Sequence, residues 1–250
     1  MNPGANPLEL DAINVVIVGA GAIGSALVSE LLKRPQIATL FVLHRGTAPD
    51  FADPRVHCIS FDALDPATIA SSAAAVGQSS ERIHLLINTV GMLHGPDQAP
   101  EKRLGDIDAA KLQRSMALNA TLLPLLAQAF SSLLRHKEPA LLASLSARVG
   151  SLEDNKLGGW YSYRASKAAH NMLLLTLARE WRVSHRNVIL LALHPGTVKS
   201  RLSQPFVKAG YKNRVLSPAE SATALLEVMA RRTPGESGSF FDWRGEPIPW

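Results

Sequence analysis

The hydrophobic residues of this chain fall in short apolar runs separated by longer stretches with helical spacing. The runs are rich in Val, Ile and Leu, do not alternate with polar residues, and predict strands at 14–18, 39–43, 56–61, 82–88, 140–145, 187–193 and 238–243. The periodic stretches predict helices from Pro66 onward and over 25–33, 108–135, 161–182 and 218–231. Apolar strands that alternate with helices indicate a parallel sheet covered on both faces. The predicted fold class is therefore α/β, with a single doubly wound sheet.

Nothing resembling a linker or an internal repeat interrupts this pattern, so we expect one domain over residues 11–250, preceded by a flexible tail at 1–10. Asp65 and Pro66 predict the capped start of a helix. Pro124 predicts a kink in the 108–135 helix, because its ring clashes with the carbonyl of Ala120. The stretch 196–216 is predicted to be the longest loop near the carboxyl edge of the sheet, where ligands of such folds bind.

Composition excludes several classes of protein. With 46% hydrophobic residues in 250 the chain can bury a large core, and its single cysteine, Cys58, excludes an intrachain disulfide and is expected to be a small buried hydrophobic residue. The formal charge of +5 comes from basic residues that stand singly or in pairs, so we expect no nucleic-acid partner. The apolar runs are shorter than the about 20 residues that span a bilayer, and the first basic residue, Lys33, comes too late for a secretory signal. We therefore expect a cytoplasmic protein with no membrane partner.

The first predicted strand and its helix are joined by a turn of the form G-x-G-x-x-G. In a Rossmann-type sheet one glycine permits the tight turn, the next lets the backbone approach a pyrophosphate, and the last lets helix and strand pack closely. The free N–H groups at the helix start then bind the phosphates. The predicted phosphate-binding residues are Gly19, Gly21, Ala22, Ile23 and Gly24.

The end of the second predicted strand indicates which dinucleotide is bound. An NAD-binding protein usually carries Asp or Glu there for the ribose 2′-hydroxyl, whereas this chain has Arg45, which favours pairing with the 2′-phosphate of NADP. NAD stays possible, since Asp50 or Asp53 could curl back to the ribose and Arg45 could be a solvated charge. Asp62, after the third strand, either accepts a hydrogen bond from the adenine amino group or only initiates a helix.

Tyr163 and Lys167 stand four residues apart on a predicted helix, so their side chains point the same way. The ammonium group is expected to lower the phenol pKa from its reference value of about 10 by about 1 to 3. Tyr163 would then exchange a proton with a carbonyl or alcohol oxygen near neutral pH, and Lys167 could also bridge the nicotinamide ribose. Tyr161 is not an equivalent candidate, because the residue four positions later is Ala165.

Taken together, these motifs resemble the short-chain dehydrogenase/reductase family from residue 14 to the end, and 146–150, 155–167 and 194–200 look most like its C-factor-like branch. The resemblance implies that Asn88 and Gly91 line the adenosine side of the cofactor and that Asn119 holds a water linking Lys167 to solvent. It further implies a loop that brackets the nicotinamide amide, formed by Pro195, Gly196, Thr197 and Val198.

This chain departs from the family pattern in three places. The glycine turn is one residue shorter than usual, with Val18 where a threonine is common. The position of the serine that polarises the substrate carbonyl falls on Ala147, so Ser146 is our candidate donor to the developing oxyanion, with Ser151 in reserve. The alternative for Ser146 is a strand-end hydroxyl bonded to backbone. The 150–159 loop is longer than the family norm and is expected to reshape the pocket entrance.

The sequence therefore predicts an NADP-preferring oxidoreductase acting on a small carbonyl compound or secondary alcohol, with Tyr163, Lys167, Ser146 and Asn119 as catalytic residues. The alternative is a C-factor-like signalling or regulatory protein that binds the dinucleotide with vestigial catalysis. A homodimer or homotetramer is possible through the helices that contain Asn119 and Tyr163. The predicted pocket is mainly apolar or aromatic, lined by Met92, Leu93, His94, Trp160, Leu202 and Phe206.

Overall fold

The computed structural model describes residues 6–207, 211 and 213–250, and its core is a seven-stranded sheet. All strand pairs in this sheet are parallel, and the order is β3-β2-β1-β4-β5-β6-β9. The prediction of a single doubly wound α/β sheet is confirmed. The strands are β1 (Ile13–Val18), β2 (Ile37–His44), β3 (Val56–Ser60), β4 (Leu85–Asn88), β5 (Ala140–Leu145), β6 (Val188–His194) and β9 (Ser239–Asp242).

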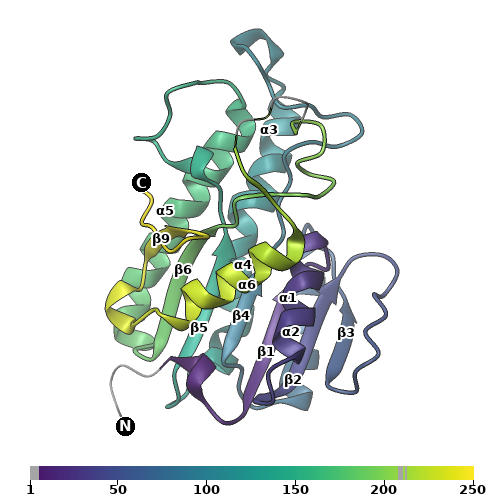
Figure 1. Cartoon of the computed structure of the whole chain (residues 1–250), viewed down its shortest axis with the longest axis vertical. Coiled ribbons are helices and arrows are strands. Elements are labelled where there is room, and N and C mark those ends of the chain that lie inside the picture. Colours follow the sequence, from purple (N-terminus) through teal and green to yellow (C-terminus); the bar gives the residue numbers. More distant parts are fainter. Residues whose placement is uncertain (1–5, 208–210, 212) are drawn as a thin grey trace.

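Helices cover both faces of the sheet, and Figure 1 shows α1 and α6 crossing one of them. On this face α1 and α6 pack against side chains such as Ile17 and Leu191, while α2, α4 and α5 pack against Val16 and Leu190 on the other. Successive residues of a strand thus point to opposite cores. The helices are α1 (Ala22–Leu32), α2 (Pro66–Ser79), α3 (Ala109–Met116), α4 (Leu122–Leu134), α5 (Tyr161–Ser184) and α6 (Pro218–Ala230).

The start of α2 is the one that the sequence predicts. The side chain of Asp65 accepts a hydrogen bond from the N–H of Ala67 at 2.9 Å, and Pro66 occupies the first turn. The long loop predicted at 196–216 contains a small parallel pair that the sequence did not indicate, β7 (Thr197–Val198) with β8 (Val215–Leu216). Positions 208–210 and 212 of that loop lie outside the described residues.

The strand β3 lies at one edge of the sheet, and this position corrects the expected burial of the strand and of Cys58. Its burial is partial, whereas the other strands are largely buried, because only β2 pairs with it. Cys58 is accordingly exposed rather than buried, with its Sγ atom 3.6 Å from the carbonyl oxygen of Pro49.

The helix predicted over 108–135 is divided into α3 and α4 by a π-helical turn at Ala117–Thr121. This turn includes Ala120, so the helix is irregular at the carbonyl with which the Pro124 ring is expected to clash. Read as one helix, Ala109–Leu134 is long and apolar enough to cross a membrane, but half of its most apolar stretch is buried inside the protein. This is the burial expected of a helix in the core of the fold.

The N-terminal segment is only partly the tail that the sequence predicts, because residues 6–10 are packed. The Asn6 side chain is buried and donates to the carbonyls of Met229 at 2.7 Å and Arg232 at 3.0 Å, at the end of α6. Leu8 joins the core below α1. The tail prediction is therefore wrong for 6–10, and residues 1–5 lie outside the described part of the chain.

The other edge of the sheet, at β9, is covered by residues 246–250. The N–H of Asp242 donates to Glu246 and the N–H of Ile248 to Phe240, both at 2.8 Å, so this segment runs antiparallel along β9. Trp250 stacks on Phe240, and its carbonyl oxygen accepts the N–H of Glu153 at 3.2 Å. The segment thereby fastens the start of the 150–159 loop to the sheet edge.

A polar network closes the amino end of β4. The N–H of Asn14 donates to Nδ1 of the buried His84, so neutral His84 carries its proton on Nε2 and donates it to Glu138 at 2.7 Å. Arg82 donates to the same carboxylate. His84, His136 and Glu138 hold possible metal-ligand atoms within 4.8 Å of one another. The His84 proton nevertheless occupies the lone pair that a metal would need.

Candidate active site

The glycine turn lies where β1, β2 and β4 end together. The N–H of Gly19 donates to the carbonyl of Leu43, and Gly19 has a φ of +95°, which a side chain would strain. A Cβ atom on Gly24 would stand 1.9 Å from the Gly19 carbonyl oxygen, so the helix touches the turn here. At Gly21, which caps α1, a Cβ atom would meet nothing within 4 Å. The turn thus has one packed side and one open side at a helix N-terminus.

The residues around the end of β2 are consistent with NADP, and they remove one of the alternatives for NAD. Arg45 is exposed, and His44 beside it is buried with no hydrogen-bond partner at Nδ1. Both carboxylate oxygens of Asp53 accept from the Arg55 guanidinium, which lowers the pKa of Asp53 to about 2. Asp53 is therefore committed to Arg55 rather than free to reach a ribose. Asp50 is exposed.

Asp62 forms the turn between β3 and α2. One of its carboxylate oxygens accepts the N–H of Leu64 at 2.9 Å, and its backbone bonds to the Thr68 hydroxyl. The helix itself is capped by Asp65, so Asp62 is not the helix-initiating carboxylate. Its other carboxylate oxygen is left for the predicted contact with the adenine amino group.

The connection after β4 lies between the glycine turn and the centre of the site. The hydroxyl of Thr89 donates to the carbonyls of Val18 and Gly19, and Asn88 accepts the N–H of Val90. A Cβ atom on Gly91 would lie 3.5 Å from Nζ of Lys167 and 3.6 Å from Oδ1 of Asn119. The backbone here passes directly over these two candidate residues, which are far apart in the sequence.

Tyr163 and Lys167 lie on one side of the first turns of α5, as their spacing predicts. Lys167 is buried and donates to the carbonyl of Leu145 at 2.7 Å, and its Nζ atom lies 6.0 Å from the centre of the Tyr163 ring. Burial lowers the pKa of Lys167 to about 8 and raises the pKa of the Tyr163 phenol above its usual value. The direction at Tyr163 is thus opposite to the expected lowering of its pKa, because burial penalises the charged phenolate.

Asn119 sits in the π-helical turn and holds the β4 connection. Its Oδ1 atom accepts the N–H of Met92 at 2.7 Å, and its amide donates to the Met92 carbonyl at 2.8 Å and to Ser166 Oγ at 3.0 Å. Since the amide group is fully engaged by protein, the predicted water would bind to the backbone that the π-helical turn leaves irregular. Its role in holding water stays a prediction.

Ser146 ends β5 and is buried below α5. Its hydroxyl donates to Oδ1 of Asn171 at 2.6 Å, so the proton that a substrate oxyanion would need is already used in this arrangement. Ala147 follows with its methyl group almost buried, and Ser151 is bonded to Trp250 and Asp154. In this structure the Ser146 hydroxyl has a structural role, as in the alternative interpretation. Its hydrogen-bond partner is a side chain, however, and not the backbone.

Ser146 is one end of a buried network that forms the floor of the site. Asn88 donates to Ser144 Oγ at 3.0 Å, and Ser144 lies 2.8 Å from Nε2 of His170. His170 in turn lies beside Asn171. Burial and the charge of Lys167 lower the pKa of His170 to about 3, so the ring stays neutral. The network joins β4, β5 and α5 under Lys167.

The predicted nicotinamide-side loop follows β6. Gly196 has a φ of +80°, and a Cβ atom there would stand 2.9 Å from both Leu216 and Trp243. Ser221 of α6 donates to the carbonyl of Pro195 at 2.8 Å, while Val198 is buried. Thr197 bonds to the Tyr211 hydroxyl at 2.8 Å. Helix α6 and β9 thus hold this loop in a fixed place beside the end of β6.

The predicted pocket residues include three aromatic rings, from three segments that meet near Tyr163. Trp160 packs against Tyr163 and Phe206, and Phe206 packs against His94. Nε2 of His94 lies 3.1 Å from the carbonyl oxygen of Arg201, which ties the β4 connection to the loop after β7. The rings line the approach to the phenol.

Two residues near this site were not predicted from the sequence. Glu101, buried in the β4–α3 connection, accepts hydrogen bonds from the N–H and the hydroxyl of Ser162 and so caps α5. Asn171 holds Ser146. The spacing of Asn171, four residues after Lys167 on the same helix face, was a usable signal, whereas nothing local in the sequence connects Glu101 to α5.

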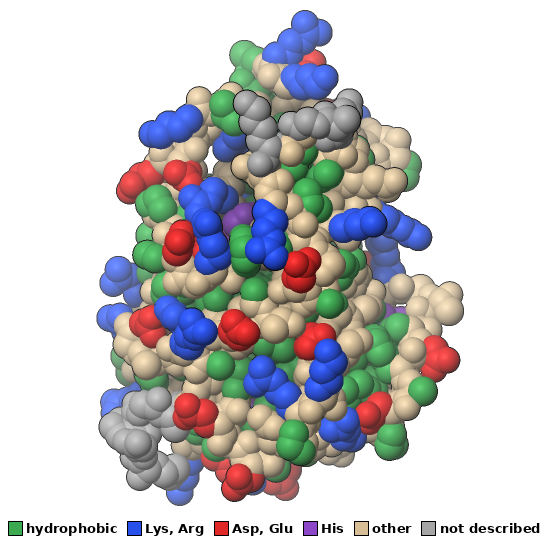
Figure 2. Space-filling model, in the orientation of Figure 1, with side chains coloured by type: hydrophobic (Ala, Val, Ile, Leu, Met, Phe, Trp, Pro, Cys, Tyr) green, Lys and Arg blue, Asp and Glu red, His purple; other side chains and the backbone are tan. Residues whose placement is uncertain are grey.

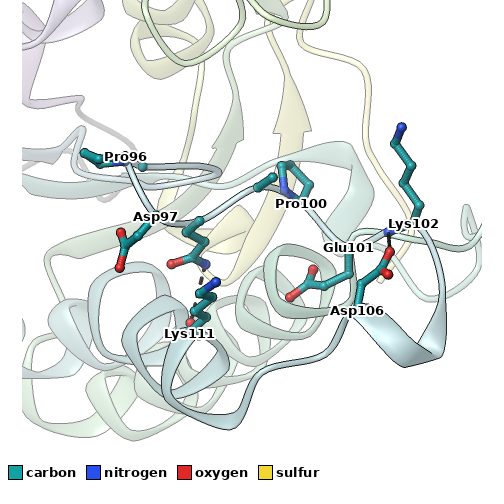
Figure 3. Close-up of a pocket in the computed structure, with 10 residues that line it drawn as sticks. Pro96, Asp97, Pro100, Glu101, Lys102, Asp106 and Lys111 are labelled. Atoms are coloured by element: carbon teal, nitrogen blue, oxygen red, sulfur yellow. Dashed lines mark hydrogen bonds between the residues drawn. The ribbon is translucent and has the colours of Figure 1, made fainter.

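A cavity of about 510 Å³ lies along the same connection, and Figure 3 shows Asp106 beside the Lys102 backbone that donates to it. Its lining comprises residues 95–102 with Asp106 and Lys111, and contains neither Tyr163 nor Lys167. The residues that fit a dinucleotide lie instead along the carboxyl edge of the sheet. The open side of the turn at Gly21 and the unpaired Nδ1 of His44 are places where that group would contact the chain.

Comparison with known proteins gives consistent matches. A family model described as short chain dehydrogenase matches residues 13–210. The chain is 34% identical over 148 residues to C-signal of Myxococcus xanthus, covering 59% of this chain and 83% of that protein. It is 30% identical over 190 residues to 1-hydroxy-2-glutathionyl-2-methyl-3-butene dehydrogenase of Rhodococcus sp. (strain AD45), covering 76% and 78%. The structure of NADPH-bound carbonyl reductase from chicken fatty liver matches with a TM-score of 0.82 at 26% identity, covering 96% of this chain and 100% of that one.

Proposed function

The chain belongs to the short-chain dehydrogenase/reductase family of NAD(P)-dependent oxidoreductases, and on that premise we propose that it is an NADP-preferring carbonyl reductase. The observation that carries the proposal is the position of Tyr163 and Lys167 on one side of α5, with Nζ of Lys167 6.0 Å from the centre of the Tyr163 ring and 3.5 Å from where a Cβ atom on Gly91 would stand. Arg45 at the end of β2 supports NADP over NAD, since Asp53 is bound to Arg55. The similarity to NADPH-bound carbonyl reductase supports the same cofactor and substrate class.

In this proposal the dinucleotide supplies the hydride, and the chain binds, orients and protonates the substrate. The Tyr163 hydroxyl donates its proton to the carbonyl oxygen as the alcohol forms, and takes it back in the reverse direction. The phenol is protonated at neutral pH and can donate, but burial raises its pKa and so makes it a weaker acid, which the charge of Lys167 has to offset as the proton leaves. Lys167, largely charged at neutral pH with a pKa of about 8, stabilises the negative charge left on the phenol.

The proposal is tested by titrating the protein with NADPH and NADH and then screening carbonyl compounds. NADPH should bind more tightly, the preference should fall in Arg45→Ala, and Tyr163→Phe should lose turnover by at least about 100-fold. The matched control is Tyr161→Phe, which removes a hydroxyl two residues away and should keep full activity. Turnover in Tyr163→Phe equal to that of the wild type would refute the assignment.

A second candidate is a dinucleotide-binding signalling or regulatory protein, favoured by the similarity to C-signal and by Ala147 at the usual serine position. The commitment of Ser146 to Asn171 adds to this case. Tight NADPH binding with no carbonyl turnover, and a cellular phenotype unchanged by Tyr163→Phe, would favour it over the reductase.

A further inference from the structure

The segment that leads into α5 has an unusual backbone. Gly158 and Gly159 have φ angles of +64° and +66°, and Trp160 follows with +52°. Among the described residues Trp160 is the one non-glycine residue with a positive φ. A large side chain in this left-handed region costs free energy, and such strain persists only where surrounding contacts fix it.

Several contacts fix this segment, one set from Glu101 in the β4–α3 connection and another from Arg164 in the first turns of α5. The Trp160 N–H donates to the carbonyl of Glu101, whose carboxylate accepts from Ser162. From the other side the Arg164 guanidinium donates to the carbonyls of Gly158 at 3.2 Å and Gly159 at 3.0 Å. The backbone that carries the indole is therefore fixed before any substrate binds.

The indole packs against the ring of the reacting phenol. The Trp160 ring centre lies 6.3 Å from that of Tyr163 at an angle of 67°, and 5.0 Å from that of Phe206 at 58°. His94 continues the group at 5.8 Å from Phe206. Trp160 is only half-buried, so part of its surface is left for a ligand. Aromatic rings favour such tilted and edge contacts, whereas a saturated ring of similar size gains only its burial.

From this geometry we propose that Trp160 determines specificity and that the substrate is a carbonyl compound with a flat aromatic group on its carbonyl carbon. The inference rests on the proposed reductase function and deepens it. A carbonyl oxygen that reaches the Tyr163 hydroxyl would bring a directly attached aryl ring to Trp160, whose ring packs against the Tyr163 ring and has Phe206 on another side. The strained backbone then has a use, since it presents the indole to that ring without rearrangement.

The test compares two ketones of equal carbon count, acetophenone and cyclohexyl methyl ketone, with NADPH as reductant. The measured quantity is the ratio of their kcat/KM values in each variant, divided by the ratio in the wild type, which cancels their different intrinsic reactivity. The preference for acetophenone should fall about 3- to 10-fold in Trp160→Leu, mainly through KM. Trp160→Gly should show the same loss on an unstrained backbone, which guards against misfolding of the leucine variant. The matched control, Tyr161→Leu, should leave the ratio unchanged.

An unchanged ratio in both Trp160 variants would overturn the inference, as would an equal fall in Tyr161→Leu. If neither ketone is turned over, the reductase proposal fails separately, and binding decides the inference. Calorimetric titration of each ketone into NADPH-saturated Tyr163→Phe should then still show tighter binding of acetophenone, lost when Trp160→Leu is added. Equal affinities for the two ketones would reject the aromatic platform.

Discussion

Replacing Gly24 with alanine would put a methyl group into the contact between α1 and the glycine turn. Its Cβ atom would stand 1.9 Å from the Gly19 carbonyl oxygen and 3.0 Å from the Thr89 hydroxyl oxygen. Relief of the first contact requires a movement of about 1 Å or more of a backbone that bonds to β2 and β4, and overpacking of this kind costs about 1–3 kcal/mol. For a domain of this size each kcal/mol lowers Tm by about 2–4 °C, so Gly24→Ala should melt about 2–12 °C below the wild type.

The same movement should weaken cofactor binding, because in the proposed complex the turn and the start of α1 carry the N–H groups that would face the phosphates. Losing one charge-assisted hydrogen bond costs about 1.5–3 kcal/mol, so the NADPH Kd should rise about 10- to 100-fold in a fluorescence titration. Gly21→Ala separates the two effects, since its methyl group enters open space at an ordinary φ of −75°. It should bind NADPH weakly but melt near the wild type.

Gly105→Ala is the matched control, because a Cβ atom there also meets nothing within 4 Å and the residue lies on an exposed turn away from the site. It should change neither Tm nor Kd. A Gly24→Ala protein with wild-type melting and wild-type NADPH affinity would refute the packing argument, and loss of stability in Gly21→Ala would contradict the open side of the turn.

Substitutions at three further positions test other parts of the structure. Because burial lowers the pKa of Lys167 from 10.5 to about 8, the unfolded chain binds more protons than the folded one between these pH values, and the free energy of unfolding should rise with pH in that window. Urea unfolding at pH 8 and at pH 10 should show a smaller rise of this free energy in Lys167→Met than in the wild type. An identical rise in the two proteins would contradict the effect of the buried lysine. Asp65→Ala removes the cap that accepts the Ala67 N–H and should cost about 0.5–2 kcal/mol in urea unfolding, whereas Asp65→Asn should retain most of it. Glu138→Ala leaves the buried His84 Nε2 proton unpaired and should lower the free energy of unfolding by about 1–3 kcal/mol. Glu138→Gln should lose less stability, because its side chain keeps an acceptor. Equal stabilities for the alanine and glutamine variants would show that the hydrogen bond to His84 contributes little.

The elements of the fold could be predicted from the sequence because their signals are local. Apolar runs and glycines identify β1, the turn and α1, and the pair Asp65–Pro66 marks α2 within one residue. The sequence did not indicate which strand ends the sheet, because that depends on partners far away in the chain. Cys58 shows the result, since an apolar run predicted its burial while the position of β3 at the edge exposes it.

The same difference between local signals and long-range contacts holds within the site. Tyr163 and Lys167 follow from one helical turn, but the pKa of the phenol depends on how deeply the folded chain buries it, and this reversed the expected direction. Ser146 was predicted as a donor from its place after β5, whereas its rotamer depends on Asn171. Glu101 stands about sixty residues before the helix that it caps, so no periodicity connects the two. Basic side chains intermix with acidic ones on the face of the molecule that Figure 2 shows. The net charge of the chain does not reveal this arrangement.

The strand order also governs the sequence of events during synthesis. After β1, the strands β2 and β3 add to one side and β4, β5, β6 and β9 add in turn to the other, so each strand leaves the ribosome after its sheet neighbour. The contact between Trp250 and Glu153 comes last. A nascent chain can therefore assemble its phosphate-binding turn early, while the 150–159 loop beside the pocket gains its anchor only once residue 250 has emerged.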